Sequence, residues 1–97
     1  MKTTEEILLI LQDFKPYAEK NYGVKVLGVF GSVARNEQTE QSDIDICYEG
    51  KALSLISIDK LQKELEERLG GRVDIVRLRE GMNPVFSGRI KKEVCYV

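Results

Sequence analysis

Gly31-Ser32-Val33-Ala34-Arg35 and the later Ser42-Asp43-Ile44-Asp45-Ile46 are the two stretches around which this sequence is organised. The first is a glycine–serine turn that follows an apolar run, and such a turn can hold phosphates. The second is typical of a strand, in which residues two apart lie on the same side with Cα atoms about 6.5–7 Å apart. The two aspartates therefore face the same way, which suits a divalent cation, while the two isoleucines face the core.

Hydrophobic periodicity extends from these stretches in both directions. Thr3 and Glu6 fit a capping box that opens a helix, and Gly23 ends that helix. The expected elements are a helix over 4–22, a strand over 24–30, a short helix over 32–36, a strand over 42–48, a helix over 57–69, a strand over 72–78, a helix over 84–92 and an edge strand over 93–97. This order predicts an α/β (α+β) fold in one domain over residues 1–97, with a small mixed β-sheet and helices packed on one face.

Two residues of the first helix carry expectations of their own. Pro16 has no amide proton and crowds the preceding turn, so we expect a kink or a break near Phe14–Lys15. Leu9 falls on the polar side of the helix. It is either an isolated exposed leucine, which is common, or part of a surface that binds a partner, and the sequence leaves both open.

The overall composition excludes several classes of protein. The 15 basic and 16 acidic residues give a net charge of −1, so no global field favours nucleic acid or an anionic membrane. The chain has no histidine, so acid–base or metal chemistry falls to other side chains. Its two cysteines form no CxxC motif, and the apolar run over 7–11 is too short to cross a membrane. We therefore expect a cytoplasmic protein with reduced thiols, no membrane association and no direct nucleic-acid binding.

The acidic residues predict a metal site. Two carboxylates as close as Asp43 and Asp45 repel each other, and a divalent cation relieves that repulsion. Asp74 stands in an otherwise apolar strand and can join them if the two strands are neighbours. Ligands that offer only oxygen favour Mg²⁺ or Mn²⁺, and three carboxylates can hold two cations about 3.5–4 Å apart.

The turn predicts an anion site beside these acids. Gly31 lets the backbone approach a ligand, and Ser32 is expected to cap a short helix whose free amides point outward. Arg35 stands where a capping box would place an acid, which keeps the start of the helix positive and open. No P-loop motif is present.

Each of these features is common alone and informative only in combination. A glycine–serine pair is usually just a turn, Asp-x-Asp is often surface decoration, and Arg35 can simply pair with a nearby acid. Cys47, on the same side of its strand as the aspartates, reads as a small side chain beside the site and not as a nucleophile. The turn, the arginine, the Ser-Asp-x-Asp strand and the later aspartate together point to phosphoryl chemistry.

In this combination the sequence resembles the nucleotidyltransferase superfamily with the DNA polymerase β-like fold, and most closely its minimal nucleotidyltransferase (MNT) domains. The residues that carry the resemblance are Gly31-Ser32-x-Ala34-Arg35, Ser42-Asp43-x-Asp45 and Asp74 within Val73-Asp74-Ile75-Val76. The likeness covers nearly the whole chain. Asn36 departs from the glycine that many relatives have after the arginine, and this bears on the shape of the loop alone.

The resemblance implies a role for each motif residue. Asp43 and Asp45 would bind two Mg²⁺ ions, with Mn²⁺ as the alternative, and through them the triphosphate of ATP. Asp74 would bind the catalytic metal and help deprotonate the attacking hydroxyl. Gly31 and Ser32 would hold the β- and γ-phosphates with help from Arg35, and Ser42 belongs to the same nucleotide-binding set.

The resemblance also implies a partner. MNT domains are commonly encoded beside a HEPN protein, a helical ribonuclease toxin, and act as antitoxins that transfer AMP to a toxin tyrosine. Two alternatives stay open at the level of sequence. One is a binding module that neutralises its partner by contact, and the other is a subunit of a transferase that modifies a small molecule.

Overall fold

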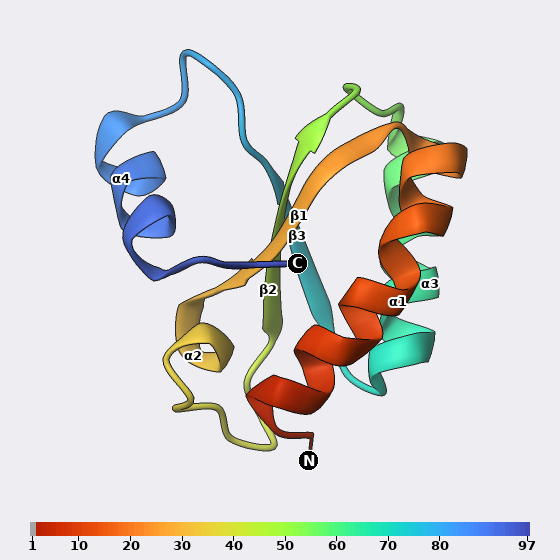
Figure 1. Ribbon diagram of the computed structural model, residues 1–97. Helices are drawn as coiled ribbons and strands as arrows, with labels where there is room; N and C mark the ends of the chain where they lie inside the picture. Colours follow the sequence, from red (N-terminus) through yellow and green to blue (C-terminus); the bar gives the residue numbers. More distant parts are fainter. Residues whose placement is uncertain (1) are drawn as a thin grey trace.

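The computed structural model describes residues 2–97 and contains a four-stranded sheet with helices on both sides (Figure 1). The elements in chain order are α1 (Thr4–Tyr22), β1 (Val24–Phe30), α2 (Gly31–Ala34), β2 (Ile44–Gly50), α3 (Leu55–Leu69), β3 (Val73–Arg77), α4 (Pro84–Glu93) and β4 (Cys95–Tyr96). The sequence predicted every one of these elements, with small shifts at their ends.

The strands lie in the order β3-β2-β1-β4. The central strand β1 is antiparallel to both β2 and β4, whereas β2 and β3 are parallel. The parallel pair is joined through α3, as parallel strands require a crossover connection. The sheet is therefore mixed, as the order of elements predicted.

Helices α1 and α3 pack on one face of the sheet and form the main core with it. α1 contributes one buried stripe at helical spacing, Ile7, Leu11, Phe14, Ala18 and Tyr22. The prediction of a helix-covered face is confirmed, and the structure adds a second contact. α4 covers part of the opposite face, where Ile90 packs with Phe30, Cys47 and Leu78 (Figure 1).

The break predicted near Phe14–Lys15 in the first helix is wrong. α1 begins with the capping box formed by Thr3 and Glu6, runs through Pro16 and ends at Gly23, which is left-handed. Phe14 and Ala18 are both fully buried on opposite sides of the proline in sequence, so core packing holds the helix together across the missing hydrogen bond. Pro16 itself is exposed, which leaves its ring outside the core.

The surface beside the C-terminus contains exposed apolar side chains. Leu9 of α1 is 65% exposed, as its position on the polar side of the helix predicted, and Tyr96 of β4 is 50% exposed. Both line a shallow cavity together with Leu8 and Val97. We call these four residues the α1–β4 patch. Within residues 2–97, no helix has the length and apolar character needed to span a membrane.

Candidate active site

The turn between β1 and α2 brings the backbone against an acid of the next strand. Gly31 has a φ of +73°, a left-handed conformation that glycine adopts without strain. A Cβ at this position would collide with the carboxylate of Asp45, because Phe30 and Asp45 are paired across β1 and β2. The glycine is therefore required both by the conformation and by the close approach of Asp45.

The short helix α2 begins one residue earlier than the sequence predicted. Its first residue is Gly31 and its N-cap is Phe30, with no side-chain cap. Ser32 lies inside the helix, so its predicted capping role is wrong. The turn from the strand is made by Gly31 in the left-handed region, and this places the serine one position further along.

The expected open anion site is also corrected, because a carboxylate of the chain itself fills it. Glu93, the last residue of α4, accepts a hydrogen bond from the amide of Gly31 at 3.0 Å through Oε2. Its other oxygen, Oε1, lies 2.8 Å from Nη1 of Arg35. The Nε of the same guanidinium lies 2.7 Å from Glu37. Arg35 therefore pairs with two acids, one of which also occupies the turn.

Asp45 and Asp74 lie side by side on the face opposite α1 and α3. They are register partners in the parallel pair of β2 and β3, where neighbouring strands lie about 4.8 Å apart. Their chain neighbours Ile44 and Val73 point into the main core, so both aspartates point away from it. The condition under which the third acid could join the pair, that β2 and β3 are neighbouring strands, is met.

Asp43 precedes β2 and is engaged elsewhere. Its Oδ1 lies 3.1 Å from Nε of Arg72, and both side chains are largely exposed. Within the described part of the chain, no three acidic or cysteine side chains converge closely enough to enclose a cation. The structure thus brings two of the three predicted acids together and leaves Asp43 in an ion pair.

The electrostatics of Asp45 nevertheless fit a cation site. Burial raises the pKa of this carboxyl above its ordinary value, and the charges of Asp74 and Asp43 raise it further. Arg35 opposes this rise, whereas Glu93 adds to it. The donor set offers only oxygen, which suits Mg²⁺ or Mn²⁺. Turning Asp43 toward the pair breaks only an exposed ion pair, typically worth about 0–1 kcal/mol, so the residues present fit the metal.

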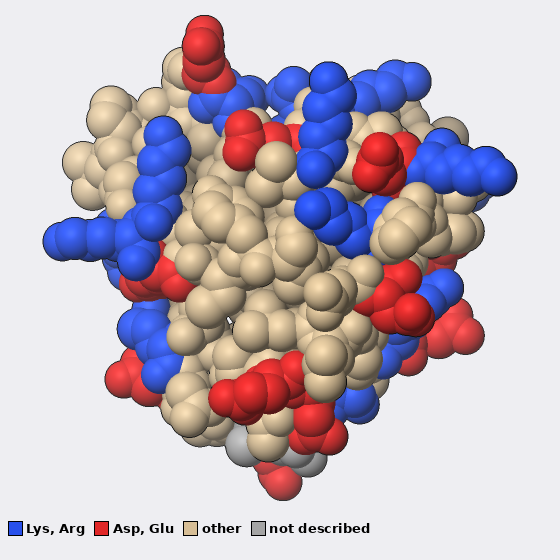
Figure 2. All heavy atoms as spheres, viewed as in Figure 1, with Lys and Arg blue, Asp and Glu red and all other residues tan. Residues whose placement is uncertain are grey.

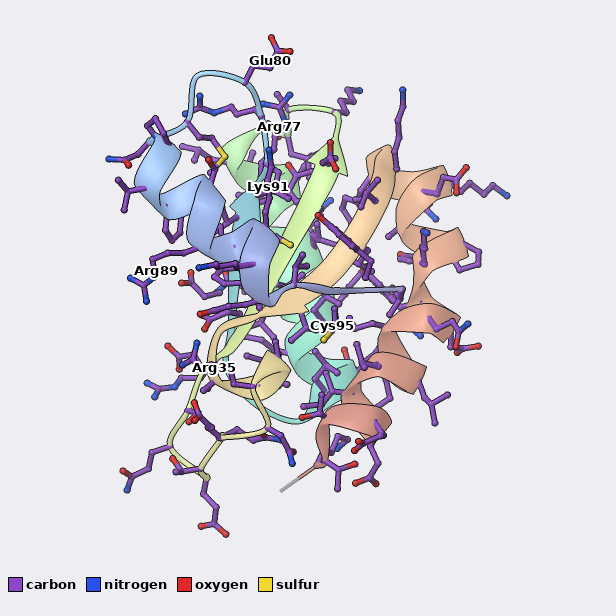
Figure 3. The ribbon with its side chains drawn as sticks, turned by 60° about the vertical axis from the view of Figure 1, so that its left-hand side comes forward. Arg35, Arg77, Glu80, Arg89, Lys91 and Cys95 are labelled. Atoms are coloured by element: carbon purple, nitrogen blue, oxygen red, sulfur yellow. The ribbon has the colours of Figure 1, made fainter. Side chains whose placement is uncertain are left out.

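A cavity of about 270 Å³ lies beside these groups, between α2, β2 and the side of α4. It is lined by residues of the predicted site and of α4, namely Phe30, Gly31, Ser32, Arg35, Asp45, Phe86, Arg89, Ile90 and Glu93. Asp43 and Asp74 lie outside its lining. Figure 3 shows Arg89 of α4 and Arg35 extending on the same side of the molecule.

Two contacts, one buried and one partly buried, tie α2 and the loop after it to α1. Thr4 is the buried polar residue of the core, and its hydroxyl donates to the carbonyl of Val33 at 2.6 Å. The hydroxyl also lies 3.2 Å from Oδ1 of Asn36. Asn36 has a φ of +57°, and asparagine tolerates this left-handed conformation better than most residues. The loop therefore keeps a glycine-like conformation although the glycine itself is missing.

Ser42 does not reach the cavity beside Asp45. Its hydroxyl accepts from the amide of Thr39 at 3.0 Å, and its own amide donates to the carbonyl of Thr39. It lines a different cavity, near Gln38 and Leu69. The structure therefore gives Ser42 the role of fixing the loop that leads into β2. Ser32, by contrast, does line the cavity beside Asp45.

Sequence reasoning missed Glu93, Arg89 and Phe86, which all come from α4. Glu93 lies 62 residues from Gly31 along the chain, so no local motif joins them. One local signal was available. An acid at the C-terminal end of a helix opposes the helix dipole, and Glu93 directly follows Lys91 and Lys92 there. A residue that breaks a local preference in this way points to a tertiary role.

Comparisons with known proteins agree with this geometry. A family model described as polymerase beta, nucleotidyltransferase matches residues 12–96. Protein adenylyltransferase MntA of Thermococcus cleftensis is 38% identical over 98 residues, covering 100% of this chain and 98% of the relative. A solved structure assigned as a minimal nucleotidyltransferase has a TM-score of 0.80 at 29% identity, covering 97% of this chain and 95% of that one.

A further solved structure is a tri-AMPylated Shewanella oneidensis HEPN toxin in complex with MNT antitoxin. One chain of it has a TM-score of 0.61 at 22% identity, covering 96% of this chain and 66% of that one, and at this identity it shows the fold alone. The family match spans most of the sequence, and the fold and the full-length relative agree with it. The chain therefore belongs to the polymerase β nucleotidyltransferase family.

Proposed function

We propose that residues 1–97 form one minimal nucleotidyltransferase domain that transfers AMP from ATP to a tyrosine hydroxyl of a HEPN partner and so acts as its antitoxin. The observation that carries this proposal is the pairing of Asp45 with Asp74 on the open face, beside the turn that Gly31 and Arg35 form. The relative from Thermococcus cleftensis, which bears the name adenylyltransferase, supports AMP as the transferred group.

Each part of the site has a task in this reaction. Asp43, Asp45 and Asp74 would hold Mg²⁺ or Mn²⁺, which would neutralise the triphosphate and bring it to the acceptor. The acceptor oxygen attacks the α-phosphorus, the bond to the bridging oxygen of the β-phosphate breaks, and pyrophosphate leaves. Asp74 accepts the proton of the hydroxyl. Gly31, Ser32 and Arg35 orient the β- and γ-phosphates, so positioning and charge supply most of the catalysis.

The accessibility of Asp74 supports an acceptor on another protein. Asp74 is exposed and lies on β3, an edge strand of the sheet, outside the cavity that Asp45 lines. A side chain presented by a folded partner can therefore reach it. The solved complex of an AMPylated HEPN toxin with an MNT antitoxin supports the HEPN class of partner. The two free cysteines fit a cytoplasmic setting for this chain.

A labelling experiment tests the proposal. Purified protein, Mg²⁺ and ATP labelled at the α-phosphate are incubated with the cognate HEPN protein and with its tyrosine-to-phenylalanine variants. We expect label on the partner with wild-type protein and a loss of at least about 10–100-fold with Asp45→Asn, because changing even the groups that support a metal ligand typically costs that much and Asp45 would be a ligand itself. Asp59→Asn, which changes an exposed acid of α3 paired with Lys63, is the matched control. Equal labelling by the Asp45 variant contradicts the proposed mechanism.

A second candidate function is neutralisation of the partner by contact alone. The α1–β4 patch favours it, since Figure 2 shows a largely uncharged area across the centre of this face, over β4 and the adjoining part of α1. If Asp43→Ala/Asp45→Ala still neutralises the partner at equal concentrations while Leu9→Ser does not, contact is the mechanism. Loss of neutralisation by the double variant with an intact complex supports AMP transfer.

A further inference from the structure

Glu93 makes contacts that a phosphate group would be expected to make. Its two oxygens are shared between the amide of Gly31 at 3.0 Å and the guanidinium of Arg35 at 2.8 Å. The first is a backbone N–H donor and the second is a charged guanidinium. Proteins use both kinds of group to hold phosphate oxygens. Both belong to the turn to which the nucleotide's β- and γ-phosphates are assigned above.

The position of Glu93 in its helix shows that these contacts compensate a local conflict. It is the last residue of α4, where the unpaired carbonyls of the helix repel a carboxylate. Its side chain is 22% exposed, so the contacts with the turn are made in a partly desolvated place. It also lies near Asp45, whose pKa its charge raises. A dianionic or more highly charged ligand entering the turn therefore meets an acid already in place.

We infer that Glu93 is a built-in substitute for a phosphate group, which the triphosphate must displace from Gly31 and Arg35 before it can bind. This inference rests on the proposed function, because it assigns the turn to the β- and γ-phosphates of ATP. Glu93 lowers the affinity of the site for triphosphates in two ways. It occupies both donors, and its negative charge opposes the ligand.

Arg89 provides a place for the displaced carboxylate. It stands four residues before Glu93 on α4 and lines the same cavity, and side chains at this spacing are neighbours on a helix. Among the described residues Arg89 makes no ion pair. Glu93 can thus exchange Arg35 for Arg89 by a change of side-chain rotamer, without unfolding the helix.

Calorimetric titration with inorganic triphosphate in the presence of Mg²⁺ tests this inference, because the probe lacks both base and sugar and reports on the phosphate contacts alone. We expect Glu93→Gln to bind triphosphate about 10-fold more tightly than the wild type, since a neutral amide competes more weakly for Gly31 and no longer neutralises Arg35. Glu93→Ala, which leaves both donors free, is expected to bind at least as tightly.

Glu37→Gln is the matched control, because Glu37 pairs with the same guanidinium but does not touch Gly31. It changes the net charge equally, and we expect its affinity to stay within about 2-fold of the wild type, since exposed pairs contribute little. A similar gain in both variants would mean that net charge alone sets the affinity, and it overturns the inference. So does an unchanged or weaker affinity of both Glu93 variants, provided that thermal unfolding shows at least one of them folded.

The outcomes separate this inference from the proposed function. Absence of label on the partner with a gain in triphosphate affinity for Glu93→Gln contradicts the proposed transfer and keeps the substitute role of Glu93. AMP transfer by the wild type, with no gain in triphosphate affinity for Glu93→Gln, supports the proposed transfer and contradicts the substitute role of Glu93. In an active system, the KM for ATP is expected to fall in Glu93→Gln, a change that a purely structural role of the residue would not produce.

Discussion

Gly31 combines two demands that no other residue type meets. Its backbone is left-handed, and the space where a Cβ would stand is filled by the carboxylate of Asp45. Conformational strain at a non-glycine residue in this region costs on the order of 1–3 kcal/mol. At this position the same substitution also moves Asp45, so stability and chemistry are affected together.

We therefore predict that Gly31→Ala lowers the free energy of unfolding by about 2–6 kcal/mol, the sum expected for strain and overpacking. Gly88→Ala is the control, because Gly88 is a helical residue of α4 and an added Cβ would meet no atom within 4 Å outside its own stretch of helix. It should stabilise the protein by about 0.5–1 kcal/mol. Urea unfolding of the three proteins measures both effects, and equal changes would contradict the contact with Asp45.

The charge of Asp45 is expected to reduce stability in the absence of metal. Its pKa is raised on folding by burial and by Asp74 and Asp43, so the charged form is less favourable in the folded protein than in the unfolded chain. This cost is fully present at pH values above the raised folded pKa. It disappears as the pH falls through that pKa toward the unfolded value.

Asp45→Asn should therefore unfold at a higher temperature than the wild type at pH 7 without metal, with a gain of about 0.5–2 kcal/mol as is common when a strained functional site is neutralised. The difference in stability between Asp45→Asn and the wild type should shrink as the pH is lowered. Adding Mg²⁺ should raise the melting temperature of the wild type and not of the variant. Thermal unfolding with and without chelator checks this, and a less stable variant at neutral pH would contradict it.

At the scale of elements, α1 shows how packing overrides local preference. The helix continues through Pro16 because the residues on either side of it, Phe14 and Ala18, are both fully buried. The missing hydrogen bond to the carbonyl of Gln12 remains a cost within a helix that is otherwise continuous. The core that the helix forms with the sheet outweighs this cost.

Pro16→Ala should accordingly stabilise the protein by about 1–3 kcal/mol, since alanine restores the hydrogen bond and removes the ring clash. The gain is reduced by the greater freedom that the unfolded chain acquires. Asp13→Ala, a neighbouring exposed substitution in the same helix, serves as the comparison and should change stability by at most about 0.5 kcal/mol. Chemical denaturation measures the free energy of unfolding of both variants. A loss of stability in Pro16→Ala would contradict the prediction and show that the helix requires the proline.

The pair Arg89 and Glu93 gives α4 a testable part in nucleotide binding. If Arg89 acts by receiving Glu93, Arg89→Gln should weaken triphosphate binding several-fold in the wild-type background and have little effect in Glu93→Gln. A double-mutant cycle of dissociation constants measures this coupling. An equal loss in both backgrounds would mean that Arg89 contacts phosphate directly.

For the molecule as a whole, the two cysteines report on how α4 closes over the sheet. Cys47 is fully buried beneath α4, and burial raises the pKa of its thiol to about 11. Cys95 is only partly buried in the two-residue strand β4. The thiolate is the reactive form of cysteine, and burial both disfavours the thiolate of Cys47 and blocks access to it. Cys95 should therefore react much faster than Cys47, although both are cysteine thiols.

We predict that a thiol reagent modifies one cysteine of the native protein at pH 8, and that the second reacts only after denaturation. Peptide mapping should place the fast site at Cys95. Cys95→Ala should lose the fast reaction, while Cys47→Ala should keep it. Two sites reacting equally fast in the native state would show that α4 opens readily from the sheet.

The sequence determined the elements of this protein and the identity of its chemistry. Hydrophobic periodicity, caps and turn residues are local signals, and they predicted the helices, the strands and the mixed sheet. Alternation along the predicted strand placed Asp45 on the side away from the core. These inferences succeeded because each depends on residues a few positions apart.

Only the tertiary structure decided how the site is completed. The pairing of Asp45 with Asp74 depends on the parallel register of β2 and β3, and the ion pair of Asp43 depends on where Arg72 falls. Glu93 reaches Gly31 because α4 packs on part of the open face of the sheet, a contact between residues that share no local pattern. Such contacts follow from packing of the whole chain, and for that reason the predicted open phosphate turn is, in the folded protein, closed by its own carboxylate.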